Sequence, residues 1–181
     1  MNIKNVFILF GLVLALAFFS TYQAWAQSKP GSPAPLITHS FAVEKGRYGH
    51  IWKIYIEAED PDGDMYKIAS VVDHVGYGPY PTDWIILKSQ YRESLKGYIQ
   101  WNTFSSKAHG IPEWTQITLK VSILDKAGNE SNVVIFPFTF ESGVKQQEPP
   151  APFDQGDIPR LGYIHIDLYD PRVGFVGRWN D

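Results

Sequence analysis

The chain has 181 residues, no cysteine and a formal net charge of −3 at pH 7. Without cysteine it forms no disulfide and carries no cysteine-linked lipid, so its fold depends on an apolar core. The mild acidity argues against nucleic acid and anionic membrane surfaces as partners, because both attract basic proteins. Aromatic residues are plentiful, and glycine and proline are spread between short apolar runs, a composition that favours an all-β fold.

Residues 1–26 have the pattern of a secretory signal peptide. Lys4 precedes an apolar run over residues 6–19, and Ala24-Trp25-Ala26 supplies the small residues that a signal peptidase reads. An uncleaved membrane anchor is the alternative, but this run is short against the roughly 20 residues needed to span a bilayer. We therefore expect cleavage after Ala26 and a mature chain without a membrane span. That chain would be periplasmic, associated with the cell surface or secreted.

After a Pro-rich linker at residues 27–35, residues 36–141 read as one domain of about seven short strands. The clearest strands alternate between apolar and polar residues, which is typical of a strand buried on one face. The predicted strands cover residues 36–43, 50–59, 65–75, 84–88, 97–104, 117–123 and 133–141. Short strands separated by turn residues predict a single immunoglobulin-like antiparallel β-sandwich.

Three details of this sandwich follow from the pattern. In segment 50–59 the apolar face carries Trp52, Ile54, Ile56 and Ala58. Segment 65–75 is expected to pair back onto segment 50–59 across the turn that separates them. Pro137 has no N–H to donate, so segment 133–141 is expected to be an edge strand or to contain a local break.

Residues 142–181 change character and form a linker followed by one further strand. The alternating stretch around Tyr163, Ile164, Ile166 and Leu168 is too short to be a domain, and a lone strand is not stable in water. Folding back onto the sandwich is the simpler of two alternatives. The other is that these residues pair with a sheet edge in another chain.

Two turns resemble a known family. Glu57-Ala-Glu-Asp-Pro-Asp-Gly-Asp64 is similar to the B–C turn of bacterial extracellular immunoglobulin-like modules of the cadherin-like and PKD type. Val121-Ser-Ile-Leu-Asp-Lys-Ala-Gly-Asn-Glu-Ser131 resembles the F–G hairpin of bacterial immunoglobulin-like and fibronectin type III-like domains. The resemblance covers about residues 36–141 and implies adhesion, ligand binding or spacing at the cell surface, usually without catalysis. Some family members bind calcium near these turns. The cadherin site, however, takes acidic residues from neighbouring repeats, and this chain contains only one repeat.

The first candidate site is the acidic turn. Hard cations require several oxygen ligands at one point, and Asp60, Asp62 and Asp64 offer three carboxylates. In an immunoglobulin-like sandwich the two turns above lie at the same end, so Asp125 and Asn129 are expected to join them. The spacing excludes an EF-hand. The alternative is turn chemistry alone, in which Asp60 and Asp62 cap their own backbone and Gly63 adopts a positive φ.

The second candidate site is an aromatic loop. Tyr77, Tyr80 and Trp84, with glycine and proline between them, are candidates for a flat surface that binds a sugar ring or a peptide. The alternative is that these side chains cover an open edge of the sandwich core.

No catalytic motif is present. The five histidines lie in separate segments, and the chain has no G-x-S-x-G elbow and no P-loop. We therefore predict a non-catalytic exported module, binding or structural, that contacts another protein at the cell surface or in the periplasm. It requires no cofactor, and Ca²⁺ is the candidate ion. The alternatives are a carbohydrate-binding accessory module that uses the Tyr77, Tyr80 and Trp84 loop, and a small hydrolase with paired carboxylates.

Overall fold

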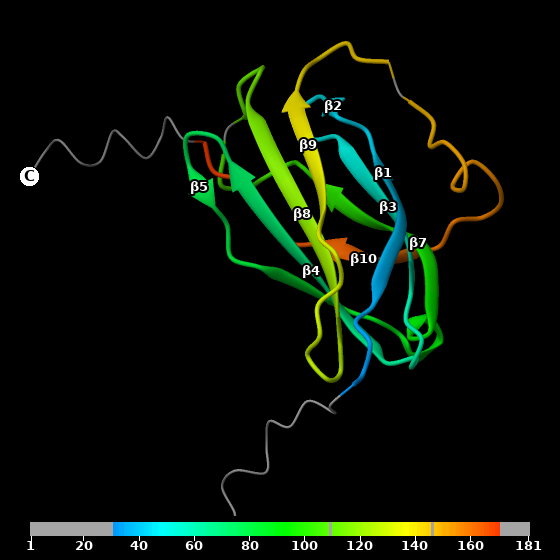
Figure 1. Cartoon of the computed structure of the whole chain (residues 1–181). Helices are drawn as coiled ribbons and strands as arrows, with labels where there is room; N and C mark the ends of the chain where they lie inside the picture. The colour runs from blue at the N-terminus through cyan, green and yellow to red at the C-terminus, as the bar shows by residue number, and fades with distance from the viewer. Residues whose placement is uncertain (1–30, 109, 146, 171–181) are drawn as a thin grey trace, which may run out of the picture. The chain divides into compact units, whose positions relative to one another are not determined.

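The computed structural model describes residues 31–108, 110–145 and 147–170, and the fold below is that of the unit that begins at Pro33. Two β-sheets pack face to face, which confirms the all-β sandwich (Figure 1). The predicted signal peptide lies outside the described residues. Among those that are described, no helix is long and apolar enough to cross a membrane.

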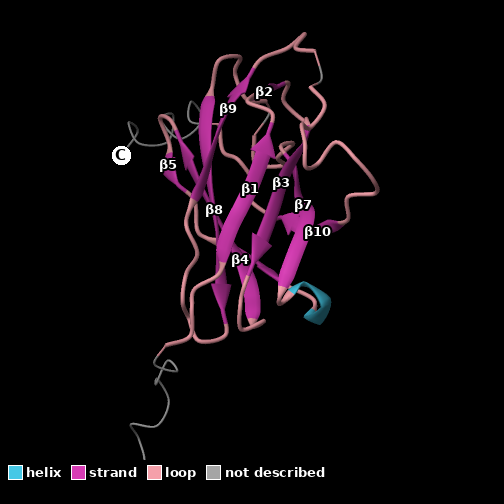
Figure 2. Ribbon diagram, turned by 45° about the vertical axis from the view of Figure 1, so that its right-hand side comes forward, coloured by secondary structure: helices cyan, strands magenta, loops and turns pink. Residues whose placement is uncertain are grey.

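The first sheet has four strands in the order β1-β3-β7-β10, which lie side by side in Figure 2. Their bounds are Leu36–Ala42 for β1, Ile51–Glu59 for β3, Ser94–Asn102 for β7 and Arg160–Ile164 for β10. β3 is antiparallel to both of its neighbours, β1 and β7. A 3₁₀ turn, η1 at Ser89–Tyr91, precedes β7.

The second sheet has six strands in the order β2-β9-β8-β4-β5, with β6 also paired to β4. Their bounds are Lys45–Gly46 for β2, Met65–His74 for β4, Gly78–Pro79 for β5, Asp83–Ile86 for β6, Gln116–Asp125 for β8 and Val134–Phe140 for β9. β8 lies at the centre and is antiparallel to β4 and β9.

The prediction that segment 65–75 pairs back onto segment 50–59 is wrong. β3 belongs to the four-stranded sheet, whereas β4 pairs with β6 and β8 in the other sheet. The turn at residues 60–64 therefore carries the chain from one sheet to the other. Alternation reveals which face of a strand is buried, but it does not reveal which strand lies next to it.

The predicted inward faces are confirmed. Trp52, Ile54, Ile56 and Ala58 have no exposed surface. The alternate apolar residues of β8 are at most 1% exposed: Ile117, Leu119, Val121 and Ile123. The Trp52 ring lies 4.6 Å from the Phe138 ring of the opposite sheet, centroid to centroid. The core between the sheets is thus continuous, and it is built from the residues that alternation places inward.

The edge position predicted for Pro137 is also confirmed. Toward the edge of its sheet, β9 pairs only with the two-residue strand β2, where Thr139 and Glu141 donate N–H groups to Glu44 and Gly46. Pro137 comes two residues earlier on the same edge, so its missing N–H faces an unpaired stretch of the strand.

The C-terminal strand folds back onto the sandwich, the simpler of the two alternatives. β10 lies parallel to β7, with Arg160 opposite Tyr98 and Ile164 opposite Trp101. β2 is also parallel to β9, so both sheets are mixed and the prediction of a purely antiparallel sandwich is wrong. In an immunoglobulin constant-type domain the corresponding sheet has the strand order A-B-E-D. β1, β3 and β7 take the places of A, B and E here, and the C-terminal strand β10 takes the place of D. The residues proposed for pairing with another chain instead complete the core of this one, since Ile164, Ile166 and Leu168 are buried while Tyr163 is exposed.

Candidate functional site

The acidic turn between β3 and β4 is organised by Asp60, which is only 1% exposed. The backbone N–H of Asp64 donates to Asp60 Oδ2 at 3.0 Å, and the N–H of Gly63 donates to the Asp60 carbonyl at 3.1 Å. Gly63 has a φ of 69°, which a glycine adopts without strain. The predicted turn chemistry is therefore present at Asp60 and Gly63.

The same turn brings three carboxylates together. One carboxylate oxygen from each of Asp60, Asp62 and Asp64 lies within 4.8 Å of the other two. The Oδ1 atoms of Asp60 and Asp64 are buried and accept no hydrogen bond from the described residues. Burial, followed by a hydrogen bond with the Asp62 carboxyl group, raises the pKa of Asp60 to about 6. The cluster thus concentrates negative charge and oxygen donors, as a site for a hard cation does.

The second acidic turn lies at the same end of the sandwich, as predicted. Met65 is opposite Asp125 in the β4–β8 ladder, and the N–H of Lys126 donates to the Asp64 carbonyl at 3.1 Å. The Asp125 carboxylate, however, accepts the N–H of Asn129 at 2.8 Å and its side-chain amide at 2.7 Å. Asp125 and Asn129 thus close their own hairpin, and the carboxylate cluster found among the described residues does not include them.

Tyr77, Tyr80 and Trp84 do not form one platform. Tyr80 is buried, with its hydroxyl 3.0 Å from His74 Nδ1 and 2.9 Å from the Tyr169 N–H that donates to it. The Tyr77 ring stacks on the Tyr169 ring at 5.1 Å and 9°. Trp84 instead lies on the outer face of the six-stranded sheet, with Lys67 Nζ 3.9 Å from its ring centroid. Tyr80 therefore follows the alternative in which aromatic residues cover the core, whereas Tyr77 is 47% exposed and stacks on the outside of Tyr80, with ring centroids 5.0 Å apart.

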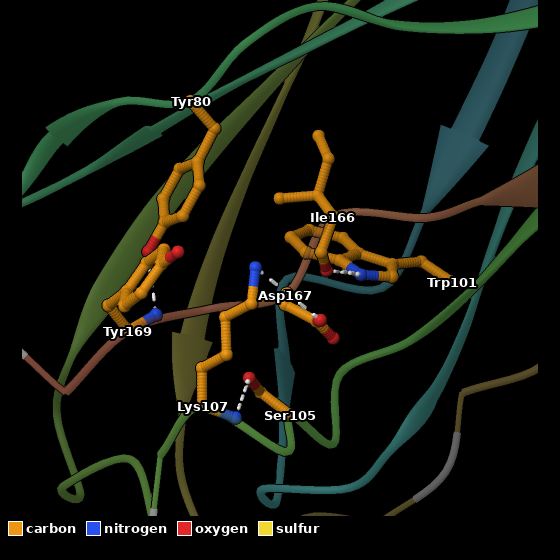
Figure 3. A network of polar contacts seen from close by, with 7 residues as sticks. All are labelled: Tyr80, Trp101, Ser105, Lys107, Ile166, Asp167 and Tyr169. Atoms are coloured by element: carbon orange, nitrogen blue, oxygen red, sulfur yellow. Dashed lines mark hydrogen bonds and ion pairs between the residues drawn. The ribbon is translucent and has the colours of Figure 1, made fainter.

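The segment after β10 is fixed by polar contacts that sequence reasoning missed (Figure 3). Trp101 Nε1 donates to the Ile166 carbonyl at 2.9 Å, and Lys107 Nζ lies 3.8 Å from the Asp167 carboxylate. A hydrogen bond to the Tyr169 hydroxyl raises the pKa of Lys107. Trp101 and Lys107 therefore hold the segment after β10 through Ile166, Asp167 and Tyr169. The alternation of residues 163–169 was the one local signal in the sequence that this segment is ordered.

The outer face of the six-stranded sheet is a second feature that sequence reasoning missed. Its centre carries the small residues Ala69 and Ser122, which lie opposite each other on β4 and β8. Large apolar side chains lie to either side, each at least 45% exposed: Trp84, Ile86, Val133 and Ile135. An exposed apolar surface of this kind marks a candidate contact site.

Comparison with known proteins gives a likeness to solved structures but no match to a protein family. No protein-family profile matches the chain, and no curated protein matches it. Among solved structures, the chain is similar to the PKD domain of an M14-like peptidase from Thermoplasmatales archaeon SCGC AB-540-F20. The identity is 15% and the TM-score 0.39, over 61% of this chain and 98% of that domain. An identity this low gives no information about function.

Proposed function

We propose that the chain is a non-catalytic exported module that contacts another protein and is stabilised by a calcium ion at the acidic turn. The observation that carries the calcium part is the buried Oδ1 atom of Asp60, which has no hydrogen-bond partner among the described residues and belongs to a cluster of three carboxylates. The apolar outer face of the six-stranded sheet supports the contact with a protein.

A calcium ion would remove the unfavourable part of this turn. A buried carboxylate is costly unless hydrogen bonds or an opposite charge compensate it. Calcium takes six to eight oxygen ligands in flexible geometry, and Asp60, Asp62 and Asp64 supply carboxylate oxygens within one turn. Because the Asp64 carbonyl also accepts the Lys126 N–H, the ion would stiffen both turns at this end of the sandwich.

Thermal unfolding of residues 27–181 in EDTA and then in Ca²⁺ tests the ion. At a hundredfold excess over Kd, a ligand specific for the folded state adds about 2.7 kcal/mol. For a domain of this size that corresponds to a rise in Tm of about 5–10 °C. Asp60→Asn keeps the shape of the side chain, removes its charge and is expected to abolish the rise. Asp154→Asn, a change of an exposed acid outside the cluster, is the control and should keep it. Equal Tm values for the unaltered chain in both buffers would leave turn chemistry as the whole role of the cluster.

The outer face of the six-stranded sheet suits a flat protein surface. Lys67 lies over the Trp84 ring on this face, and the Lys120–Asp73 pair at 2.7 Å is neutral overall. Apolar side chains with small residues between them provide the contact area that protein interfaces bury at their centre.

Site-specific photo-crosslinking in the producing cells tests this face. A photoreactive residue at position 86 or 135 is expected to yield one discrete crosslinked product. The same residue at Thr38, exposed on the other sheet, serves as the control and should yield none. Identical patterns at all three positions would remove the face as the contact site. The sugar-binding alternative through Tyr77, Tyr80 and Trp84 is not proposed, because the three rings do not share a surface.

A further inference from the structure

The segment between β9 and β10 is held at both ends against the sandwich. Ser142 donates from its N–H and its hydroxyl to the two oxygens of the Glu113 carboxylate. At the other end Phe153 is 3% exposed, and its ring lies 5.5 Å from the Tyr55 ring on β3. In Figure 1 this segment, coloured from yellow to orange, runs from the end of β9 to the start of β10. We call residues 142–145 and 147–153 the strap.

A cleft of about 330 Å³ lies between the strap and the four-stranded sheet. Its apolar wall is formed by Phe41, Val43 and Tyr55 of the sandwich and by Val144 of the strap. A second hollow of about 430 Å³ shares several of these residues and continues to Pro137 and the open edge of β9. Volumes of this size are typical of ligand sites, and two adjoining hollows suit an extended ligand better than a compact one.

The cleft is cationic although the protein is acidic. Four cations line it against two acids: Lys45, Arg47, Lys53 and Lys145 against Glu141 and Glu148. One pair is internally neutral, because Lys45 Nζ lies 2.8 Å from the Glu141 carboxylate. The remaining cations outnumber the remaining acid, whereas the whole chain has a formal charge of −3. A concave surface lined by one sign of charge concentrates ligands of the opposite sign.

His50 lies in the same cleft. Its ring stacks on Phe138 with centroids 6.1 Å apart. Burial, followed by the charge of Arg47, lowers the pKa of His50. The histidine therefore contributes a neutral, flat wall at pH 7, and the anion attraction of the cleft comes from Arg47, Lys53 and Lys145.

We propose that this cleft binds an acidic glycan chain. Arg47 and Lys145 would meet its carboxylate or sulfate groups, and Phe41 and Tyr55 would contact the flat faces of its rings. An acidic peptide fits less well, because a peptide added as a strand to β9 would find no N–H at Pro137. A third hollow beyond Tyr55 contains three acids, Glu148, Asp154 and Asp157, against the single cation Lys53. The second hollow contains one acid, Glu44, against the two cations Lys45 and Lys145, so the chain would extend toward β9 and not toward β7.

Titration of ¹⁵N-labelled residues 27–181 with oligogalacturonate, followed by NMR, tests the proposal. Every sample contains EDTA, because carboxylates bind calcium and the acidic turn must not contribute. Saturable shifts are expected at the amides of Arg47, Lys53 and Val144. The methyl-esterified oligomer has the same rings without the charge, and it should bind at least about tenfold more weakly.

Two double variants separate this site from general charge attraction. Arg47→Gln with Lys145→Gln should weaken binding about tenfold or more. Lys88→Gln with Lys126→Gln removes two exposed cations outside the cleft and should leave the affinity within about twofold. Equal loss in both variants, shifts elsewhere, or no shifts at all would overturn the proposal. So would equal binding of sodium sulfate, of monomeric galacturonate or of polyglutamate, which would indicate a simple anion site or a peptide site. Because every sample contains EDTA, these outcomes do not depend on whether the acidic turn binds calcium.

Discussion

We predict that removing residues 160–181 unfolds the domain and does not merely expose a sheet edge. The truncation deletes four side chains that are each at most 9% exposed: Leu161, Ile164, Ile166 and Leu168. Burying such a side chain contributes about 1.5–3 kcal/mol, so the four together contribute about 6–12 kcal/mol. A typical domain is stable by about 5–15 kcal/mol in total, so little or no stability would remain.

Polar groups add to the loss. Trp101 is 1% exposed, and its Nε1–H donates to the Ile166 carbonyl. The Tyr80 hydroxyl, which is also buried, loses the N–H of Tyr169. The Trp101 N–H left without its acceptor costs about 1–3 kcal/mol, whereas the Tyr80 hydroxyl keeps its contact with His74 Nδ1 at 3.0 Å. The tail is therefore expected to be an integral part of the core and not an accessory to it.

Circular dichroism, NMR and thermal unfolding of residues 27–159 and 27–181 measure this effect. A third chain that ends at Asp170 retains the described contacts of the tail and serves as the control. We expect the control to unfold cooperatively, and residues 27–159 to lack a cooperative transition. A cooperative transition of residues 27–159 within about 5 °C of the control would refute the reasoning. It would also restore the alternative in which this strand pairs with a second chain.

Two further results are expected. Gly97→Ala would place Cβ 2.6 Å from Leu161 Cγ and 2.8 Å from the Pro159 carbonyl oxygen. This overpacking should lower the free energy of unfolding, measured in urea, by about 1–3 kcal/mol. The control Gly110→Ala adds a Cβ with nothing within 4 Å and should lower it less. The second result concerns pH in the presence of EDTA. The Asp60 carboxyl group has a pKa of about 6 in the folded chain and of 3.8 in the unfolded chain, so the folded chain holds this proton over a pH range in which the unfolded chain has lost it. The free energy of unfolding should therefore fall by on the order of 3 kcal/mol as the pH rises from 3.8 to 6; a free energy that does not change with pH would contradict the raised pKa.

The sequence predicted the inward face of β3 because alternation directly reflects burial. Trp52 and its alternate neighbours are buried as predicted, and Pro137 lies on a sheet edge. The turn at Gly63 was predictable for a similar reason, since its conformation depends on residues within a few positions. These properties depend on local sequence and need no knowledge of which strands are neighbours.

Contacts between distant residues were beyond the same reasoning. The Tyr80 hydroxyl bonds the N–H of Tyr169, 89 residues away, so the sequence allowed burial of Tyr80 as an alternative but could not identify the residue that contacts it. The assignment of β4 to the second sheet also depends on long-range pairing with β8. At Asp125 a local contact prevailed, because its carboxylate bonds Asn129 within its own hairpin and not the residues of the neighbouring turn.

The direction of β10 explains why the strap and its cleft exist. β9 ends beside β2 at one end of the sandwich, whereas β10 begins opposite Tyr98, in the middle of β7, and runs back toward that same end. The chain must therefore return along the sandwich before a parallel strand can begin, and Phe153 packs on Tyr55 along the way. An antiparallel tail strand would begin at the end where β9 stops and would need no strap. The docking of β10 thus fixes the path of the strap and, with it, the shape of the cleft. A change that loosens β10 is expected to open the cleft without altering any of its cations, because β10 contributes no residue to the lining.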